Sequence, residues 1–180
     1  MLPDDKDKFP DKELIIEELL DKYGSEVKRL AFLYVKDTSL AEDIMQEVFI
    51  ACYKSLDSFK GESSYRTWLI RITINKSKDA LRKWSFKNLV YKSSIFIKDS
   101  KTPESISFQK IENGLLMQRI LELPLKYREL ILLYYYQELT IEEICKITKL
   151  NVNTIKTRLH RARKILNNTI KEGDFIWREI

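Results

Sequence analysis

The 180-residue chain has few of the residues that interrupt or cross-link regular structure. It contains 4 glycines, 4 prolines, 2 cysteines and 1 histidine. So few glycines and prolines argue against a turn-rich β fold, and two cysteines cannot build a disulfide scaffold. The longest charge-free run, residues 130–137, has eight residues, whereas a bilayer-spanning helix needs about 20. Residues 1–12 are charged and lack the apolar segment of a signal peptide. These absences predict a cytoplasmic, mostly helical protein without membrane insertion.

Charge is distributed unevenly along the chain. Apolar residues make up 44% of the sequence, enough for a core, and the net charge is +5. Residues 59–110 carry 12 basic and 4 acidic side chains, and residues 146–170 carry 7 basic and none acidic. Two cationic blocks favour two contacts with a polyanion, either a nucleic acid or a membrane surface. Composition alone is also compatible with a solvated, lysine-rich surface.

Apolar periodicity predicts a first helical unit over residues 1–84. Its helices are expected at 11–22, 25–35, 39–56 and 64–84. The third is expected to begin at Ser39, because Ser39 and Glu42 match a capping box. Its buried stripe is predicted from three- and four-residue steps as Ile44, Met45, Val48, Phe49, Cys52 and Leu56. Its opposite face holds Asp43, Gln46, Glu47 and Tyr53. The loop at 58–63 precedes a fourth helix that is both amphipathic and basic.

Periodicity weakens over residues 85–110, which predicts a linker, and returns in a second unit over 111–180. There, helices are expected before Leu123 and at 124–137, 141–148 and 152–170. Thr140 starts a second capping box, and Asn151 is a good N-cap for the last helix. Cys52 and Cys145 both lie on apolar stripes and are expected to be buried, inert thiols.

Residues 140–166 match a helix-turn-helix: a short capped helix, a turn and a longer basic helix. The last helix has an apolar stripe, formed by Ile155, Leu159, Ala162 and Leu166. Its outer face carries groups that suit phosphates and base edges in a major groove, namely Lys156, Thr157, His160, Arg161 and Lys164. Taken alone, this unit is also compatible with a structural helical hairpin.

Aromatic residues interleave with the first cationic block. Phe59, Tyr65, Trp68 and Trp84 alternate with lysine and arginine, an arrangement that suits unstacked single-stranded bases. Trp68 shares a stripe with Ile72, which favours a place in the core instead, and the positions of Phe59 and Tyr65 stay open.

The sequence has no motif for catalysis or for holding a cofactor. It contains no glycine-rich phosphate loop, no nucleophile elbow and no His-Glu-x-x-His pair. His160 has no second histidine or cysteine pair with which to bind a metal ion. We therefore expect neither an enzyme nor a metal or cofactor site.

Two sets of motifs resemble the bacterial extracytoplasmic-function (ECF) sigma factors. Residues 41–49, 59–61 and 65–75 are similar to conserved region 2 of that family. Residues 123–128, 139–144 and 154–163 are similar to its region 4. The resemblance implies an all-α fold of two small helical domains, with region 2 at 1–84, a linker at 85–110 and region 4 at 111–180.

The resemblance also implies a function and its partners. The family supplies dissociable promoter-specificity subunits of RNA polymerase, which recognise a duplex −35 element and a melted −10 element. The implied partners are core RNA polymerase, through its β′ clamp and β flap, and promoter DNA. An anti-sigma factor that holds the protein inactive until a stress signal is a further implied partner. Such inhibitors are often membrane-bound and would tether the protein indirectly.

Matching motif positions carry the family's site residues onto this sequence. The implied polymerase contacts are Asp43, Gln46 and Glu47. The implied −10 contacts are Phe59, Lys60, Ser63, Tyr65, Arg66, Asn75 and Asp79. The implied −35 contacts are Thr154, Lys156, Thr157, Arg158, His160 and Arg161. Asn153 stands where the family usually has glycine, Cys145 where it usually has alanine, and Asp79 is acidic in a DNA-facing region, so the promoter sequence stays open.

Two other classes of protein compete with this interpretation. A stand-alone helix-turn-helix regulator would need a single basic block and a dimerisation stripe, whereas this chain has two blocks and no heptads. An RNA-binding or purely structural helical protein is disfavoured because no RNA-module signature is present.

Overall fold

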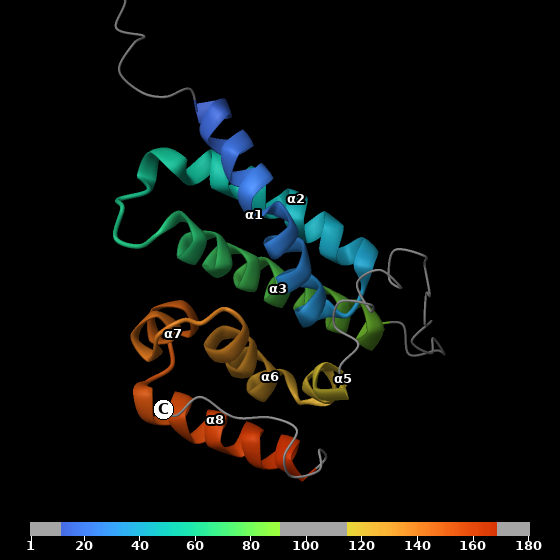
Figure 1. Ribbon diagram of the computed structural model, residues 1–180. Coiled ribbons are helices and arrows are strands. Elements are labelled where there is room, and N and C mark those ends of the chain that lie inside the picture. Colours follow the sequence, from blue (N-terminus) through green and yellow to red (C-terminus); the bar gives the residue numbers. More distant parts are fainter. Residues whose placement is uncertain (1–11, 91–114, 169–180) are drawn as a thin grey trace, which may run out of the picture. The chain divides into compact units, whose positions relative to one another are not determined.

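The protein divides into two compact units, residues 1–94 and 95–180. The computed structural model describes residues 12–90 and 115–168, and within these ranges the regular structure is entirely helical (Figure 1). Unit 1 contains α1 (Lys12–Val35), α2 (Thr38–Ser55), the short 3-10 turn η2 (Leu56–Ser58) and α3 (Tyr65–Val90). Most of the predicted linker, and the predicted end of the last helix at residue 170, lie outside the described residues.

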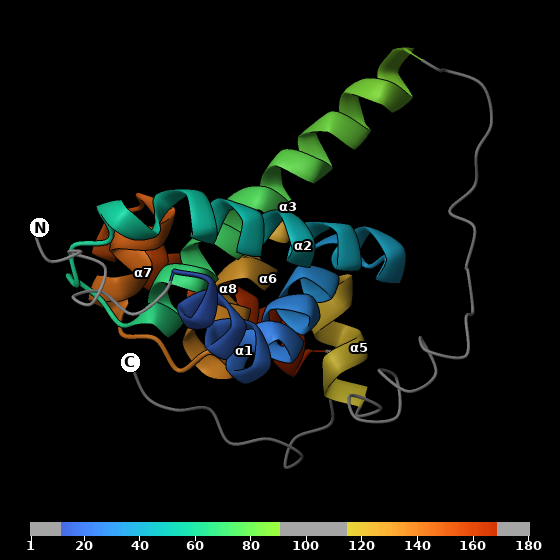
Figure 2. The same ribbon diagram turned by 90° about the horizontal axis from the view of Figure 1, so that it is seen from above.

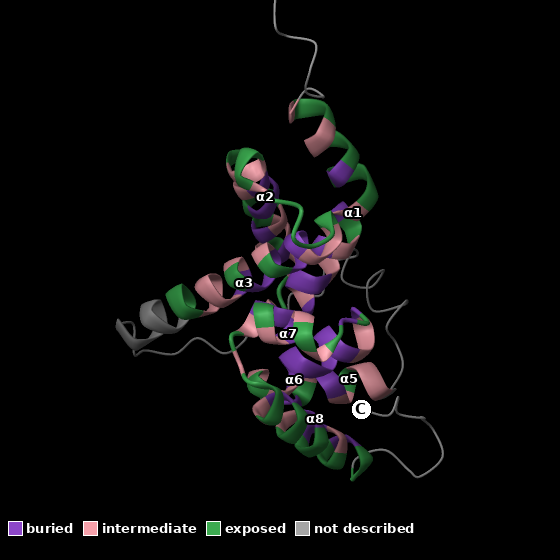
Figure 3. Cartoon of the chain, turned by 90° about the vertical axis from the view of Figure 1, so that its left-hand side faces the viewer, coloured by how far each residue is buried: buried purple, intermediate pink, exposed green. Residues whose placement is uncertain are grey.

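The core of unit 1 forms where α1, α2 and α3 pack pairwise against one another. Buried residues concentrate on their facing sides (Figure 3). The main core residues are Leu19, Val27, Ala31, Ala41, Ile44, Val48, Phe49, Cys52, Trp68 and Leu69. The C-terminal half of α3 extends past the other two helices (Figure 2). The predicted stripe of α2 is confirmed for Ile44, Val48, Phe49 and Cys52, whereas Met45 and Leu56 are only partly buried.

The two helices predicted at 11–22 and 25–35 form one helix, α1. Gly24 in its middle costs about 1 kcal/mol relative to alanine, but Leu19 and Val27, on either side of it, are both buried. Packing on both halves of the helix therefore outweighs the local propensity. Gly24 is itself buried, and a Cβ atom there would lie 3.3 Å from Leu20 Cδ1.

The helix predicted at 39–56 is α2, and its predicted start at Ser39 is wrong, because Asp37 is the N-cap. Its Oδ1 accepts a hydrogen bond of 2.8 Å from the backbone N–H of Leu40. Asp37 has extended backbone dihedrals, whereas Thr38 and Ser39 are already helical. Asp and Ser are comparable N-caps, so residue preference does not select one over the other. The position of the cap is set instead by the backbone of the α1–α2 turn, where Lys36 has φ of 60°.

α3 begins one residue after its predicted start and continues past Trp84 to Val90, into the segment predicted to be linker. Ser64 precedes its first turn, and the Ser64 hydroxyl accepts a 3.0 Å hydrogen bond from the N–H of Thr67. Trp68 is in the core, as its shared stripe with Ile72 indicated.

Unit 2 contains α5 (Leu115–Glu122), α6 (Leu125–Ile131), the π-helical turn η3 (Leu132–Tyr136), α7 (Ile141–Thr148) and α8 (Val152–Asn167). The helix predicted at 124–137 is present as continuous helical structure over residues 125–136, but its last turn is π-helical rather than α-helical. The N–H of Gln137 donates to the carbonyl of Leu132 at 2.8 Å, five residues back. Leu132, Leu133 and Tyr134 in this π turn are all buried, and so are the four preceding residues 128–131 of α6, so this segment is covered on all sides.

The helix-turn-helix predicted in unit 2 is present as α7 and α8. The capping box at Thr140 and Glu143 is confirmed, and Asn151 Oδ1 accepts a 2.8 Å hydrogen bond from the N–H of Thr154. Lys149 ends α7 in a left-handed conformation, with φ of 61°. The predicted stripe of α8 is buried throughout, at Ile155, Leu159, Ala162 and Leu166.

The two cysteines differ in environment. Cys52 is buried as predicted, and burial raises the pKa of its thiol to about 11, which keeps it protonated and unreactive at neutral pH. The prediction for Cys145 is wrong, because this thiol is only half-buried. Ile144 and Ile147 occupy the inward positions of α7, and Cys145 is rotated away from them.

None of the described helices is both long and apolar enough to cross a bilayer.

The cap of α2 gives a direct stability test. We expect Asp37→Ala to lower the free energy of unfolding of unit 1 by about 1 kcal/mol, because an N-cap acceptor is lost. The matched change Ser39→Ala should have an effect within about 0.5 kcal/mol, since Ser39 lies inside the helix. Urea unfolding followed by the fluorescence of buried Trp68 measures both. A larger loss from Ser39→Ala than from Asp37→Ala would contradict this assignment.

Candidate functional site

One face of α2 carries the three predicted polymerase-binding residues side by side. Asp43, Gln46 and Glu47 are all exposed, while Ile44 and Val48 point into the core. This face continues with two exposed apolar side chains, Ile50 at 55% and Tyr53 at 39% exposure. Ile50 was not among the predicted contacts, although it lies three residues after Glu47 on the same side of the helix. We call Asp43, Gln46, Glu47, Ile50 and Tyr53 the α2 face.

The α2 face is linked to α3 by an ion pair. Lys76 Nζ lies 3.1 Å from Glu47 Oε2, and both side chains are partly exposed. Lys76 directly follows Asn75, one of the predicted −10 residues. The pair therefore joins the α2 face to the segment of α3 that carries Asn75.

Three aromatic rings pack together at the start of α3, with Phe59 stacked on Tyr65 and tilted against Trp68, and we call this cluster the aromatic stack. The centroids of Phe59 and Tyr65 are 4.6 Å apart, and those of Phe59 and Trp68 are 4.8 Å apart. Trp68 is in the core, Phe59 is half-buried, and Tyr65 is 37% exposed. The stack therefore runs from the interior to the surface, and it settles the open question about Phe59 and Tyr65: both pack on the buried tryptophan, with Tyr65 outermost.

The loop between Phe59 and Tyr65 is exposed. Lys60 and Ser63, two predicted −10 residues, are both on the surface. Gly61 has φ of 68°, in the left-handed region that glycine adopts without steric cost, so it allows the turn. The tip of the loop is thus solvent-accessible, while both of its ends are held by the aromatic stack.

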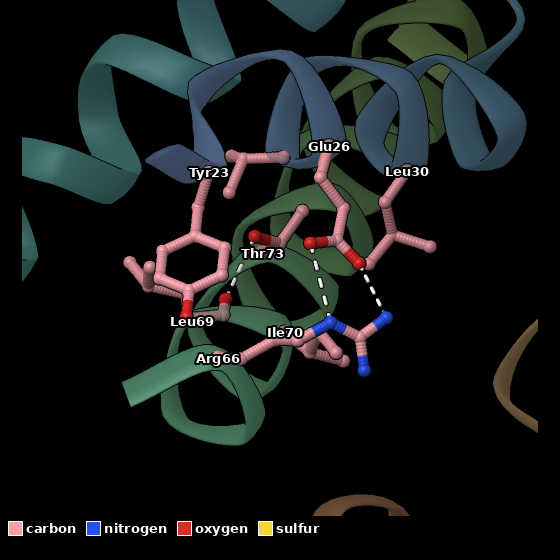
Figure 4. A pocket seen from close by; sticks show the side chains of 8 residues that line it. Tyr23, Glu26, Leu30, Arg66, Leu69, Ile70 and Thr73 are labelled. Atoms are coloured by element: carbon pink, nitrogen blue, oxygen red, sulfur yellow. Dashed lines mark hydrogen bonds and ion pairs between the residues drawn. The ribbon is translucent and has the colours of Figure 1, made fainter. Parts of the chain in front are cut away.

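Arg66 is directed toward α1 rather than away from the protein. Its Nη2 donates to Glu26 Oε1 at 2.5 Å and its Nε donates to Glu26 Oε2 at 3.3 Å (Figure 4). The two residues lie at the rim of a shallow hollow between α1 and α3, lined also by Tyr23, Leu69 and Thr73. Because the partners are 40 residues apart in sequence, no local sequence signal could have indicated Glu26.

The remaining predicted −10 residues lie farther along α3. Asn75 is exposed, and Asp79 is half-buried and paired with Arg82 one turn on. At 1.5 Å per residue, Asp79 lies about 20 Å along the helix from Tyr65. The structure therefore places the seven predicted residues along one helix and its preceding loop, not in one pocket.

The predicted −35 residues lie on α8, four of them on the side away from its buried stripe and two beside that stripe. Lys156, Thr157, His160 and Arg161 are exposed, and Thr154 and Arg158 are half-buried. The helix carries no acidic residue, so its cations are not neutralised within it. The polar surface continues to the end of α8, where a shallow hollow is lined by His160, Arg163, Lys164, Asn167 and Asn168.

Within residues 12–90 and 115–168, no cluster of three or more histidine, cysteine or acidic side chains could hold a metal ion. The exposed groups of α8 include cations, hydroxyls and amides, with no carboxylate among them. Such groups bind phosphates and base edges.

Comparison with known proteins adds family relationships to this geometry. The family model "Sigma-70 region 2" matches residues 19–86, and "Sigma-70, region 4" matches residues 113–166. The chain is 33% identical to the ECF RNA polymerase sigma factor SigW of Bacillus subtilis, over 93% of this chain and 91% of SigW. It is 30% identical to the ECF RNA polymerase sigma-E factor of Escherichia coli K12, over 85% of each chain.

Solved structures share the fold at lower identity. The sigma factor RpoE of Bartonella quintana, crystallised with the anti-sigma factor NepR, superposes with a TM-score of 0.68 at 20% identity, covering 86% of this chain and 95% of RpoE. CnrH, in complex with the cytosolic domain of CnrY, gives a TM-score of 0.63 at 20% identity, covering 87% of this chain and 88% of CnrH. With both sigma regions matched in order and relatives aligned over nearly their full length, the chain belongs to the ECF family of RNA polymerase sigma factors.

Proposed function

We propose that this sigma factor divides its work between its two units. Unit 1 docks on core RNA polymerase through the α2 face and captures the melted −10 strand with the loop before α3. Unit 2 reads the −35 duplex with α8. The observation that carries the proposal is the pairing of two different exposed surfaces on one chain: an aromatic stack beside an open loop, and a cationic helix of a helix-turn-helix. We assign residues 1–84 to the region 2 domain, 85–110 to the linker, whose first six residues continue α3, and 111–180 to the region 4 domain.

Capture of the −10 strand uses stacking and charge rather than groove reading. Extruding a base from a duplex costs a few kcal/mol, and stacking on an aromatic ring returns about 1–3 kcal/mol per base. Tyr65 offers an exposed ring, and Lys60 supplies an exposed cation in the loop before it. Asn75 and Asp79 follow on the same helix, where they meet the neighbouring nucleotides. Strand opening then needs neither ATP nor a catalytic residue in this chain, consistent with a transcription regulator rather than an enzyme.

Recognition of the −35 element uses the major groove. An α-helix fits this groove, and arginine, lysine and hydroxyl groups there contact base edges and phosphates. Lys156, Thr157, His160 and Arg161 are exposed for this purpose, with Thr154 and Arg158 at the flank. Each unit alone is expected to bind DNA weakly. Because polymerase holds both units on one promoter, binding of the second element becomes effectively intramolecular.

We also propose an anti-sigma factor as a partner. RpoE of Bartonella quintana, which has the same fold, was crystallised with one. The exposed Ile50 and Tyr53 give the α2 face an apolar part that an inhibitor could cover, which would block polymerase docking. The protein would work in the cytoplasm, with polymerase and DNA, and a membrane-bound inhibitor would tether it there indirectly.

The proposed function as a whole is tested by run-off transcription. Purified bacterial core polymerase is incubated with fragmented genomic DNA of the source organism, with and without this protein. We expect discrete transcripts that need both components, and their start sites give the −35 and −10 sequences. The absence of such transcripts, together with tight, salt-sensitive duplex binding by the protein alone, would instead indicate a stand-alone regulator.

The role of α8 is tested by Lys156→Ala combined with Arg161→Ala. We expect use of a promoter that depends on its −35 element to fall at least about tenfold, because two cationic contacts are lost. Affinity for core polymerase should be unchanged, and Lys146→Ala, an exposed charge on α7, serves as the matched control. A parallel loss of promoter use and polymerase binding in a folded variant would refute the division of labour.

The role of the α2 face is tested by Asp43→Arg combined with Glu47→Arg. We expect affinity for core polymerase to fall at least about tenfold, because two anionic contacts become repulsive. Since Glu47 also pairs with Lys76, the control is Lys76→Gln, which breaks the same ion pair and leaves the α2 face intact. Unchanged co-purification of the double variant with core polymerase would contradict this assignment.

A further inference from the structure

We propose that Glu26, on α1, is a positioning residue for capture of the melted −10 strand. It holds the guanidinium of Arg66 and thereby fixes the first turn of α3 together with the loop at residues 59–64. This inference rests on the proposed function of that loop. It changes the role of Arg66 from a direct contact with DNA to the attachment of the loop to α1.

The contact between the two residues is specific in geometry. The carboxylate of Glu26 receives two hydrogen bonds from the guanidinium, one at 2.5 Å from Nη2 and one at 3.3 Å from Nε (Figure 4). A two-point contact between planar groups fixes orientation as well as distance. Both side chains are about two-thirds buried, with relative exposures of 36% for Arg66 and 28% for Glu26. The charge of the Arg66 guanidinium is therefore largely compensated by Glu26 within unit 1.

Arg66 lies in the first turn of α3, directly after the loop, so its contact with Glu26 attaches that end of the loop to α1. It follows Tyr65, whose ring stacks on Phe59 at the other end of the loop, at 4.6 Å. Ser64 caps the same turn through the N–H of Thr67. The aromatic stack fixes this turn toward the core through Trp68, and the Glu26 contact fixes it toward α1. The first turn of α3 is therefore attached on two sides, to the core and to α1.

Fixing both ends of the loop at residues 59–64 lowers the entropy that is lost when the loop binds the −10 strand. The residues at the tip of the loop, Lys60 to Ser63, are exposed, and among them only Gly61 has a special backbone conformation. Ordering such a segment on binding consumes part of the interaction free energy, and pre-organisation reduces that loss. The Glu26 contact supplies this pre-organisation without touching the DNA.

A positioning role and a direct contact by Arg66 differ in the sign of one measurement. If Arg66 contacted the DNA itself, Glu26→Ala would release the guanidinium and leave binding of the strand unchanged or tighter. If Glu26 positions the loop, Glu26→Ala and Arg66→Ala should weaken binding to a similar extent, and the double variant should be no weaker than either single one.

The test uses holoenzyme and a fluorescent single-stranded oligonucleotide with the non-template −10 sequence of a promoter mapped by run-off transcription. We expect Glu26→Ala and Arg66→Ala each to lower its affinity about fivefold, with affinity for core polymerase unchanged. The exchanged pair, Glu26→Arg with Arg66→Glu, should restore binding to within about twofold, because it rebuilds the ion pair and places an anion at a helix N-terminus, where it is favoured.

The control is Lys28→Ala, which breaks another ion pair of α1, at 2.5 Å to Glu42 on α2, away from the loop. An equal loss of strand binding in this control would show general destabilisation and overturn the inference. Unchanged or tighter binding by Glu26→Ala, or failure of the exchanged pair to restore binding, would overturn it too. If wild-type holoenzyme did not prefer the −10 oligonucleotide over a scrambled one, the proposed function itself would fall.

Discussion

Burial of the first half of α3 against α1 and α2 is the constraint on which the rest of unit 1 depends. Trp68, Leu69 and Ile70 are consecutive and all buried, which is possible because α3 is covered from two sides. Only a narrow strip of its surface is left for solvent. That strip includes Arg71 and Asn75, one turn apart. The packing of apolar side chains thus decides which polar groups of α3 are exposed to solvent.

The same constraint organises unit 2 in a simpler way. α8 is covered on one side, and its buried residues recur at the steps of a single stripe, from Ile155 to Leu166. The positions outside this stripe are at least partly exposed, and α8 has no acidic residue to offset its cations. A helix covered on one side leaves a broad polar face, as the proposed reading of a major groove requires, whereas α3, covered on two sides, leaves only a narrow strip and the loop before it for the proposed −10 contacts.

Local signals in the sequence predicted the parts of the fold that local interactions determine. The Thr140 capping box, the Asn151 cap and the stripe of α8 each involve residues within a few positions of one another, and all three were confirmed. Contacts between distant residues were not accessible in this way. The continuity of α1 through Gly24, the choice of Asp37 over Ser39, and the pairing of Arg66 with Glu26 depend on tertiary packing. The motifs in the sequence were enough to predict the family, whereas the contact between Arg66 and Glu26 could be identified only in the structure.

The central claim is that each unit reads its own promoter element. Site-specific photo-crosslinking tests it most directly, with one photoreactive residue at Lys60 in the loop and another at Lys156 on α8, both exposed. Holoenzyme is irradiated on a promoter whose start site is mapped. The account requires crosslinks from position 60 to the non-template strand of the −10 element and from position 156 to the −35 duplex. Crosslinks from both positions to the same element, or an exchange of the two, would contradict it.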